Sequence, residues 1–247
     1  MRHVALSGWI LAGLMFSAGL LAGCVQEKRR IEPTVVPNIL LGPMTIAVAP
    51  ALNQSGATEF DPSRFADLMA SELGQADGIK VIPVSRVLGV LAAQGVDRVE
   101  SQSHARDVSI LLGADAILVF AVTEYDPYDP PRIAISAQLY GSRPFRGSGA
   151  LDPVALSKET GLASSATGQG PRGLLAESQR VFDASHDSVI EEVKEFAACR
   201  GGKVSPYGWR RFLVSQQDYI RFCCHATIRV LLNSGKEAHL ADMTRER

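Results

Sequence analysis

The sequence predicts a single α/β domain with a three-layer-like arrangement, in which a mixed sheet of about five strands is packed with helices. Between residues 44 and 125, short β-branched runs alternate with amphipathic stretches, the pattern of β-α-β units. A run at 132–140 then alternates apolar and polar residues, as an antiparallel strand does. Apart from one amino-terminal run, no apolar stretch approaches membrane-spanning length.

Five segments are predicted to be strands. MTIAVAP at 44–50 and IKVIP at 79–83 are short apolar runs that end in proline. The strongest strand pattern is ADAILVFAVTEY at 114–125, which RIAISAQLY at 132–140 follows as an antiparallel neighbour. LLAESQRVFDA, from residue 174, has the pattern of an edge strand.

The helices are predicted from apolar periodicity and from end signals. Asp61 and Pro62 are suited to the start of a helix whose apolar face comprises Phe65, Leu68, Met69 and Leu73. Further helices are expected from Ser85 to Gly95, over 103–112 and over 187–200. A last helix is expected over 216–233, burying Tyr219, Phe222, Cys223, Ala226 and Val230.

The predicted organisation has four parts. They are a signal peptide at 1–23, a modified cysteine and tether at 24–43, the α/β domain at 44–234 and a polar tail at 235–247. Within the domain, residues 141–173 contain seven glycines, three prolines and five serines without a sustained period, which is typical of a flexible insert.

Leu21, Ala22, Gly23 and Cys24 end an apolar run that follows Arg2 closely. A positive start, an apolar middle and small residues before the cleavage site are the features of a secretory signal peptide. The four residues resemble the bacterial lipobox. This resemblance implies cleavage before Cys24, a thioether-linked diacylglycerol on its sulfur and an acyl group on its amine. No other cofactor is predicted.

The alternative is an uncleaved membrane anchor, because Val4 to Gly23 is about 20 residues, enough to span a bilayer. An anchor does not need small residues before a cysteine. By analogy with lipoproteins, Val25 in place of aspartate after the cysteine favours the outer membrane, with the domain facing the periplasm. Lys28, Arg29 and Arg30 in the tether are either a solvated run or a contact to anionic headgroups.

The charge balance argues against nucleic acid as a partner. Lys and Arg total 25 and Asp and Glu total 26, and removing residues 1–23 takes away only Arg2. Nucleic-acid binding needs clustered Lys and Arg, which near-neutrality does not provide.

Three cysteines remain beside Cys24 in a compartment expected to be oxidising. One intrachain disulfide is allowed, with Cys199 pairing with Cys223 or Cys224. The alternative is three buried free thiols.

The segment from Met44 to Tyr140 resembles the group of envelope lipoproteins that includes the TolB amino-terminal domain, CsgG and LpoB. The residues that carry the likeness are IAVAP with Asn53, SRFADLMASEL, KVIP, SRVLGVLAAQG and LLGADAILVFAVTEY. Gly113-Ala114-Asp115 before a hydrophobic strand is its most specific part. The resemblance implies a mostly non-catalytic role in assembly, scaffolding or activation, exercised by binding within the envelope.

No catalytic or metal site is predicted. The histidines do not form H-E-x-x-H, and no nucleophile elbow or phosphate loop is present. Cys224 and His225 are adjacent, but neighbours on a helix point about 100° apart, so a core cysteine beside a partly exposed histidine is expected. The acidic segment from Glu124 to Pro131 is interpreted as a turn rather than a calcium loop.

The predicted partner surface contains aromatic and arginine side chains, the types that dominate interface energies. Its members are Tyr207, Trp209, Arg210, Arg211, Arg221 and Arg229. The partner is an envelope protein or a glycan, with lipid headgroups a further option. The alternative is a packed Trp209 and Phe212 beside solvated arginines.

These features predict a lipid-anchored, periplasm-facing, non-catalytic binding or assembly component of the bacterial envelope, attached to the membrane by its lipid. The second hypothesis is a CsgG-like secretion component. The 141–173 segment lacks the alternation that barrel strands need. An unrecognised hydrolase is third.

Overall fold

The computed structural model describes residues 43–142, 173–201 and 205–245, with side chains in the last helix described as far as Asn233. The chain divides into two units, Met1–Glu32 and Pro33–Arg247, and every described residue belongs to the second.

Several predictions concern residues outside the described part. These are the signal peptide at 1–23, the lipobox, Cys24 and the tether, together with residues 143–172 of the predicted insert.

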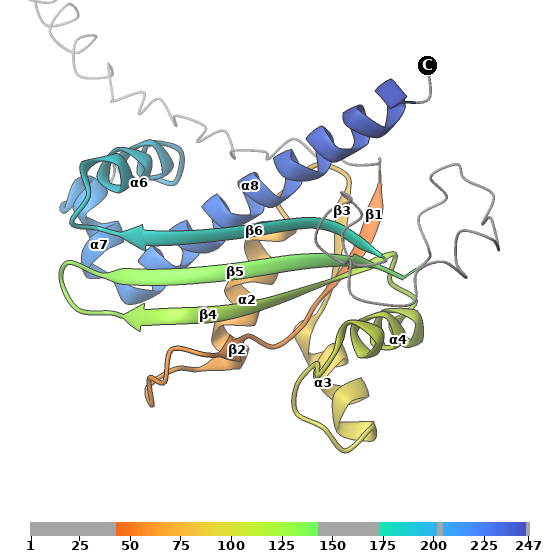
Figure 1. Ribbon diagram of the computed structural model, residues 1–247. Coiled ribbons are helices and arrows are strands. Elements are labelled where there is room, and N and C mark those ends of the chain that lie inside the picture. The colour runs from red at the N-terminus through yellow and green to blue at the C-terminus, as the bar shows by residue number, and fades with distance from the viewer. Residues whose placement is uncertain (1–42, 143–172, 202–204, 246–247) are drawn as a thin grey trace, which may run out of the picture. The chain divides into compact units, whose positions relative to one another are not determined.

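In the described residues, six strands form one mixed sheet in the order β3-β1-β4-β5-β6, with β2 also beside β4 (Figure 1). The bounds are β1 Met44–Val48, β2 Leu52–Asn53, β3 Ile79–Ile82, β4 Ala116–Asp126, β5 Arg132–Gly141 and β6 Leu174–Asp183. β1 runs parallel to β3 and β4, β2 runs parallel to β4, and β4, β5 and β6 are antiparallel. The predicted α/β class and the edge position of β6 are confirmed.

The helices begin close to where their sequence signals predict. Their bounds are α2 Pro62–Leu73, α3 Val84–Ala93, α4 Gln102–Leu112, α6 Asp187–Cys199, the 3-10 helix η2 Gly208–Arg210, α7 Arg211–Val214 and α8 Gln216–Arg245. In α2, Asp61 Oδ1 accepts hydrogen bonds from the main-chain N–H groups of Ser63 and Arg64, at 3.0 and 3.1 Å. These bonds satisfy amides that the first helical turn leaves free.

The Gly113-Ala114-Asp115 segment joins α4 to the sheet. Gly113 ends α4 with φ +66°, a left-handed conformation that glycine adopts without a Cβ clash. Asp115 then fixes β1 from both its main chain and its side chain. Its N–H donates to Thr45 O and its Oδ2 accepts from Thr45 N, both at 2.8 Å. This part of the motif sets the register between β1 and β4.

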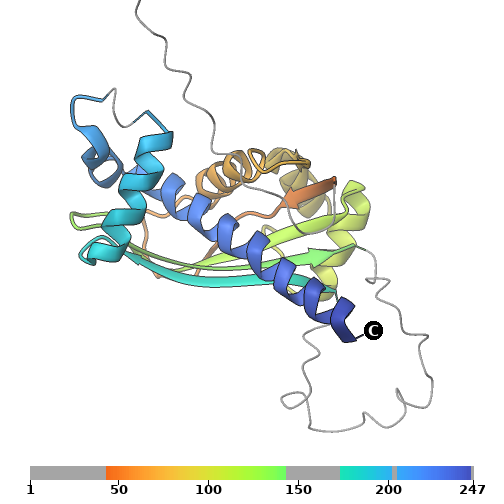
Figure 2. The ribbon, with the colours of Figure 1, turned by 90° about the horizontal axis from the view of Figure 1, so that it is seen from above.

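Helices cover both faces of the sheet, which makes the three-layer arrangement. α2, α6 and α8 share one hydrophobic core with the face that includes Ile46, Leu118 and Phe182. α3 and α4 pack with Ala47, Ile117 and their neighbours on the opposite face. Figure 2 shows α8 lying across the strands on the same face as α6.

The last helix is longer and more deeply buried than predicted. It starts at Gln216 as expected but ends at Arg245, so the backbone at 235–245 is helical rather than a frayed tail. The segment is rich in good helix formers, and a single Gly235 costs only about 1 kcal/mol. The seven residues from Phe222 to Ile228 are all buried, whereas Val230 is only half-buried.

The acidic segment from Glu124 to Pro131 comprises the end of β4 and the hairpin turn to β5. Asp126 Oδ1 accepts a hydrogen bond from Tyr128 N at 3.1 Å, and Glu124 pairs with Arg132 at 3.1 Å. Two of the carboxylates considered as cation ligands are thus used within the hairpin, which supports the turn interpretation.

In the portion of the chain that the structure describes, no helix combines the length and apolar character that crossing a bilayer requires.

We predict that Asp61→Ala lowers the free energy of unfolding by about 1 kcal/mol, because two amides of the first turn of α2 lose their acceptor. Urea unfolding followed by circular dichroism measures the change. Asp61→Asn is the control, since its side-chain oxygen still accepts, and it should lose less. Equal losses in the two variants would contradict the capping role.

Candidate functional site

The amino-terminal part of the predicted partner surface, from Tyr207 to Arg211, follows α6. Trp209 lies in η2 and is half-buried, with Lys194 Nζ 5.1 Å and Arg210 Cζ 4.9 Å from the centre of its ring. Contacts of this kind hold a cation against the face of an aromatic ring. Tyr207 precedes Trp209 in the sequence and is 74% exposed, and Val214 follows it and is 79% exposed. We call Lys194, Tyr207, Trp209, Arg210 and Val214 the corner surface.

The cations near the corner surface are mostly paired. Arg211 Nε lies 2.8 Å from Asp218 Oδ2, and Lys194 Nζ lies 2.7 Å from Glu191 Oε1. Arg210 has no ion-pair partner among the described residues. Phe212 is buried in the core, as the alternative interpretation expected of it. The surface therefore presents apolar and aromatic groups with little excess charge.

Arg221 and Arg229 do not belong to the corner surface. Arg229 is exposed on α8, away from the packed side of the helix. Arg221 is half-buried and directs its Nε toward Glu72 Oε1, 3.8 Å away. Two of the six predicted surface residues thus have other surroundings.

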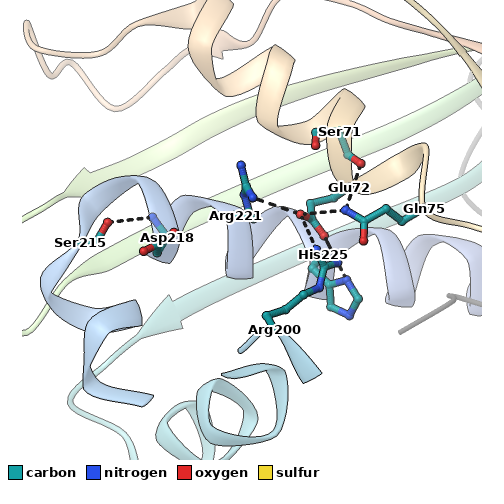
Figure 3. A network of polar contacts seen from close by, with 8 residues as sticks. All are labelled: Ser71, Glu72, Gln75, Arg200, Ser215, Asp218, Arg221 and His225. Atoms are coloured by element: carbon teal, nitrogen blue, oxygen red, sulfur yellow. Dashed lines mark hydrogen bonds and ion pairs between the residues drawn. The ribbon is translucent and has the colours of Figure 1, made fainter. Parts of the chain in front are cut away.

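Glu72 is at the centre of a polar cluster that joins three elements (Figure 3). It is fully buried on α2, and Arg200, just after α6, approaches both of its carboxylate oxygens. Arg200 Nη2 lies 2.6 Å from Oε2 and Nη1 lies 3.4 Å from Oε1. His225 on α8 places Nδ1 3.4 Å from Oε2, and Gln75 donates to Oε1 from 3.4 Å. We call these residues and Arg221 the Glu72 cluster.

Charge in the Glu72 cluster is unevenly divided, because one carboxylate faces two guanidinium groups and an imidazole. Three buried nitrogen atoms of the Glu72 cluster make no hydrogen bond within the described structure: Arg200 Nε, Arg221 Nε and His225 Nδ1. A buried ion pair stabilises only when both partners remain, and losing one leaves an uncompensated charge. Glu72 is therefore a structural requirement rather than a free catalytic carboxylate.

The sequence contains a signal for this cluster that the predicted site residues do not include. Glu72 lies seven residues after Phe65 and so falls on the apolar face of α2, where a carboxylate predicts a buried partner. Arg221 and His225 are four residues apart and share one face of α8. His225 is only 4% exposed, so the expectation of a partly exposed histidine is wrong.

All three cysteines outside the signal region are free thiols in the structure, so the Cys199–Cys223 disulfide is not formed. Cys223 is completely buried in the core, whereas Cys199 is half-buried at the end of α6. Burial raises the pKa of both Cys223 and Cys224 well above that of an ordinary thiol. Cys224 contributes to the rise at Cys223, and Glu72 to the rise at Cys224. Both groups are held as unreactive thiols.

A pocket of about 490 Å³ lies at the carboxyl end of β1. Its walls come from the segment after β1, from the start of α2 and from the loop between α3 and α4. The lining residues are Pro50, Ala51, Leu52, Asn53, Gln54, Pro62, Asp97, Arg98, Val99 and Glu100. The chain leaves β1 for one face of the sheet and β3 for the other, and such a switch point is where open α/β sheets bind ligands.

Two features restrict what this pocket accepts. The amino terminus of α2, the usual anion site in such a crevice, already binds the carboxylate of Asp61. The described residues contain no group of three or more His, Cys, Asp or Glu side chains able to hold a metal ion. Because Asp61 occupies the amino terminus of α2, phosphate binding there is disfavoured.

We predict that Glu72→Gln lowers the free energy of unfolding by about 3–5 kcal/mol, because Arg200 and Arg221 lose their shared counter-charge. Glu191→Gln, which breaks an exposed pair with Lys194, is the matched control and should cost less than about 0.5 kcal/mol. Chemical denaturation of both variants is the measurement. A loss for Glu72→Gln as small as that of the control would overturn the structural role.

We also predict that a thiol reagent at pH 8 labels Cys199 in the folded Cys24→Ser protein and spares Cys223 and Cys224. Raised pKa values leave little thiolate at the two buried sites. Mass spectrometry should find one label before unfolding and three afterwards. Labelling of Cys223 or Cys224 in the folded protein, or a Cys199–Cys223 bridge, would contradict this.

No protein-family model matches the chain, and no match was found among curated protein sequences. Several solved structures are similar in fold. Lipoprotein GNA1162 from Neisseria meningitidis is 19% identical, with a TM-score of 0.42 over 66% of this chain and 99% of that one. The LpoB carboxy-terminal domain from Salmonella enterica is 13% identical, with a TM-score of 0.36 over 42% of this chain and 75% of that one.

A third similar structure is the hypothetical protein CT253 from Chlamydia trachomatis, 12% identical, with a TM-score of 0.34 over 72% of this chain and 98% of that one. The similar structures thus include bacterial lipoproteins, and LpoB is among the proteins that the sequence pattern resembles. All three TM-scores are below 0.5, so these similarities carry no conclusion about function.

Proposed function

We propose that this protein is a lipid-anchored, non-catalytic binding component of the bacterial cell envelope, held at the membrane through Cys24 and facing the periplasm. The lipobox-like residues Leu21 to Cys24 support the anchor. The outer membrane is the proposed location, because Val25 stands where an aspartate would favour the inner membrane.

The corner surface is the observation that carries the binding role. Tyr207 and Val214 are largely exposed, and the nearby Trp209 ring is in contact with two cations. Exposed aromatic and aliphatic groups next to arginine are the composition of interface hot spots. The surface is built on η2 and α7, with Trp209 packed against the core, so it is preorganised for a partner.

An envelope protein is a better partner for this surface than an anionic glycan or headgroups. Binding a polyanion draws on several unpaired cations, whereas Lys194 and Arg211 are already paired with acids. Arg210 alone of the three cations near Trp209 has no such pair in the described structure. Apolar contacts from Tyr207 and Val214 then provide most of the binding energy, as in a protein interface.

A non-catalytic role agrees with the state of the interior titratable groups. The Cys223 and Cys224 thiols are kept protonated by burial, and the Glu72 carboxylate is held by Arg200. Catalytic groups have pKa values close to the working pH and reach a substrate, whereas these face the packed interior.

We predict that a photo-crosslinker placed at Val214 of the lipidated protein, in the cells that produce it, captures a defined envelope protein. Tyr207→Ala and Arg210→Glu should each abolish or strongly reduce the crosslinked band, while Lys80→Glu, an exposed charge reversal on β3, should leave it unchanged. If the crosslinked band were unchanged in both Tyr207→Ala and Arg210→Glu, the proposed binding surface would be wrong.

The anchor is tested by Cys24→Ser in the same cells. The variant should retain the precursor mass, incorporate no labelled fatty acid and lose the crosslink for lack of correct placement. Acylation of the Cys24→Ser protein, or removal of residues 1–23 from it at the normal rate, would contradict the lipoprotein assignment.

A further inference from the structure

The pocket at the end of β1 contains a free strand edge. β1 and β2 follow one another along β4: β1 pairs with Ala116–Leu118 and β2 with Ala121–Val122. β3 covers the outer side of β1 and stops at its pairing with Ala47. Within the described residues, β2 has no strand on its outer side.

The ladder shows which main-chain groups face outward. Gln54 N donates to Val122 O at 2.9 Å, and in a parallel ladder alternate residues bond to the same neighbour. Leu52 and Gln54 therefore direct their main chain toward β4. The N–H and C=O of Asn53 point to the opposite side, where the pocket is lined by Pro62 and the loop at 97–100.

Side chains hold both walls of this pocket in place. Asn53 Nδ2 donates to Ala57 O at 2.8 Å, and its Oδ1 accepts from Ser55 N and Oγ, which keeps the side chain in the loop after β2. On the opposite wall, His104 Nδ1 accepts from Glu100 N at 3.2 Å. Its Nε2 lies 2.7 Å from Gln94 Oε1, so the ring bridges the two ends of the loop.

The charged residues that line the pocket indicate which kind of ligand it binds. Asp97 and Glu100 outnumber Arg98, and Asp61 fills the helix terminus that would otherwise attract an anion. What remains is one main-chain donor, one main-chain acceptor and a surplus of negative charge. An extended peptide with a basic side chain complements all three.

We propose that this pocket binds an extended segment of another protein, which adds as a short strand beside β2 with a Lys or Arg side chain near Asp97 and Glu100. Strand addition uses main-chain hydrogen bonds for affinity and side-chain pockets for specificity. The site is separate from the corner surface, so either can fail without the other.

The test uses the mature chain with Cys24→Ser and the peptide acetyl-Thr-Val-Thr-Lys-Thr-Val-Thr-amide. Titration followed by NMR should shift the amide signals of Asn53 and of residues 97–100. The peptide with Glu in place of Lys should bind about twofold to fivefold more weakly. Alternate amides of an extended peptide face the same side, so the peptide has two sets of amides that can be N-methylated separately. N-methylation of one set should abolish binding, and N-methylation of the other set should leave it.

Two variants separate main-chain recognition from charge. Asn53→Pro and Asn53→Ala both remove the side-chain bonds to Ala57 and Ser55, and Asn53→Pro in addition removes the N–H that faces away from β4, a position where an edge strand tolerates proline. Asn53→Pro should therefore lose peptide binding relative to Asn53→Ala, which should retain it. Asp97→Lys with Glu100→Lys should reverse the preference to the Glu peptide. No binding of either peptide, or binding indifferent to N-methylation of both sets of amides, overturns the proposal. A crosslink at Val214 would still support the proposed function in that case.

Discussion

The carboxylate of Glu72 is the constraint on which the arrangement of the helices most depends. It is fully buried, and it contacts Arg200 at the end of α6 as well as Arg221 and His225 on α8. Removing a carboxylate from water is costly unless good hydrogen bonds replace its hydration, so α2 can pack here only when the other two elements are in position. The contacts of Glu72 thus specify one packing of α2, α6 and α8, which are far apart in the sequence.

The sheet explains why those helices meet. The antiparallel strands β5 and β6 extend it beyond the β-α-β part, and α8 packs against both. Tyr219 on α8 donates from its hydroxyl to Phe182 O in β6 at 3.1 Å, and Phe222 contacts the Phe182 ring edge-on. With α2 and α6 on the same face, the middle of α8 is enclosed on all sides, which accounts for a continuous buried stretch that a one-sided helix pattern does not anticipate.

Sequence signals predicted the ends of helices correctly where an interaction between neighbouring residues determines the end. Asp61 before Pro62 marked the start of α2, and Gly113 marked the end of α4, because capping involves only residues within one turn. The end of α8 was misplaced because a polar segment of good helix formers has no stop signal. Residues predicted to form one partner surface have different surroundings, since Arg221 contacts Glu72 whereas Trp209 contacts Arg210.

By itself, the sequence determined the order of the strands and helices apart from the short elements β2, η2 and α7, together with the α/β class, the edge position of β6 and the prediction that Cys24 is modified, because periodicity, caps and short motifs are local properties. Only the tertiary structure decided that Glu72 and His225 are buried together, that Cys199 and Cys223 are free thiols, and that Asn53 borders a pocket with its main chain directed away from β4. Each of these depends on contacts between residues distant in the chain, which sequence spacing does not specify.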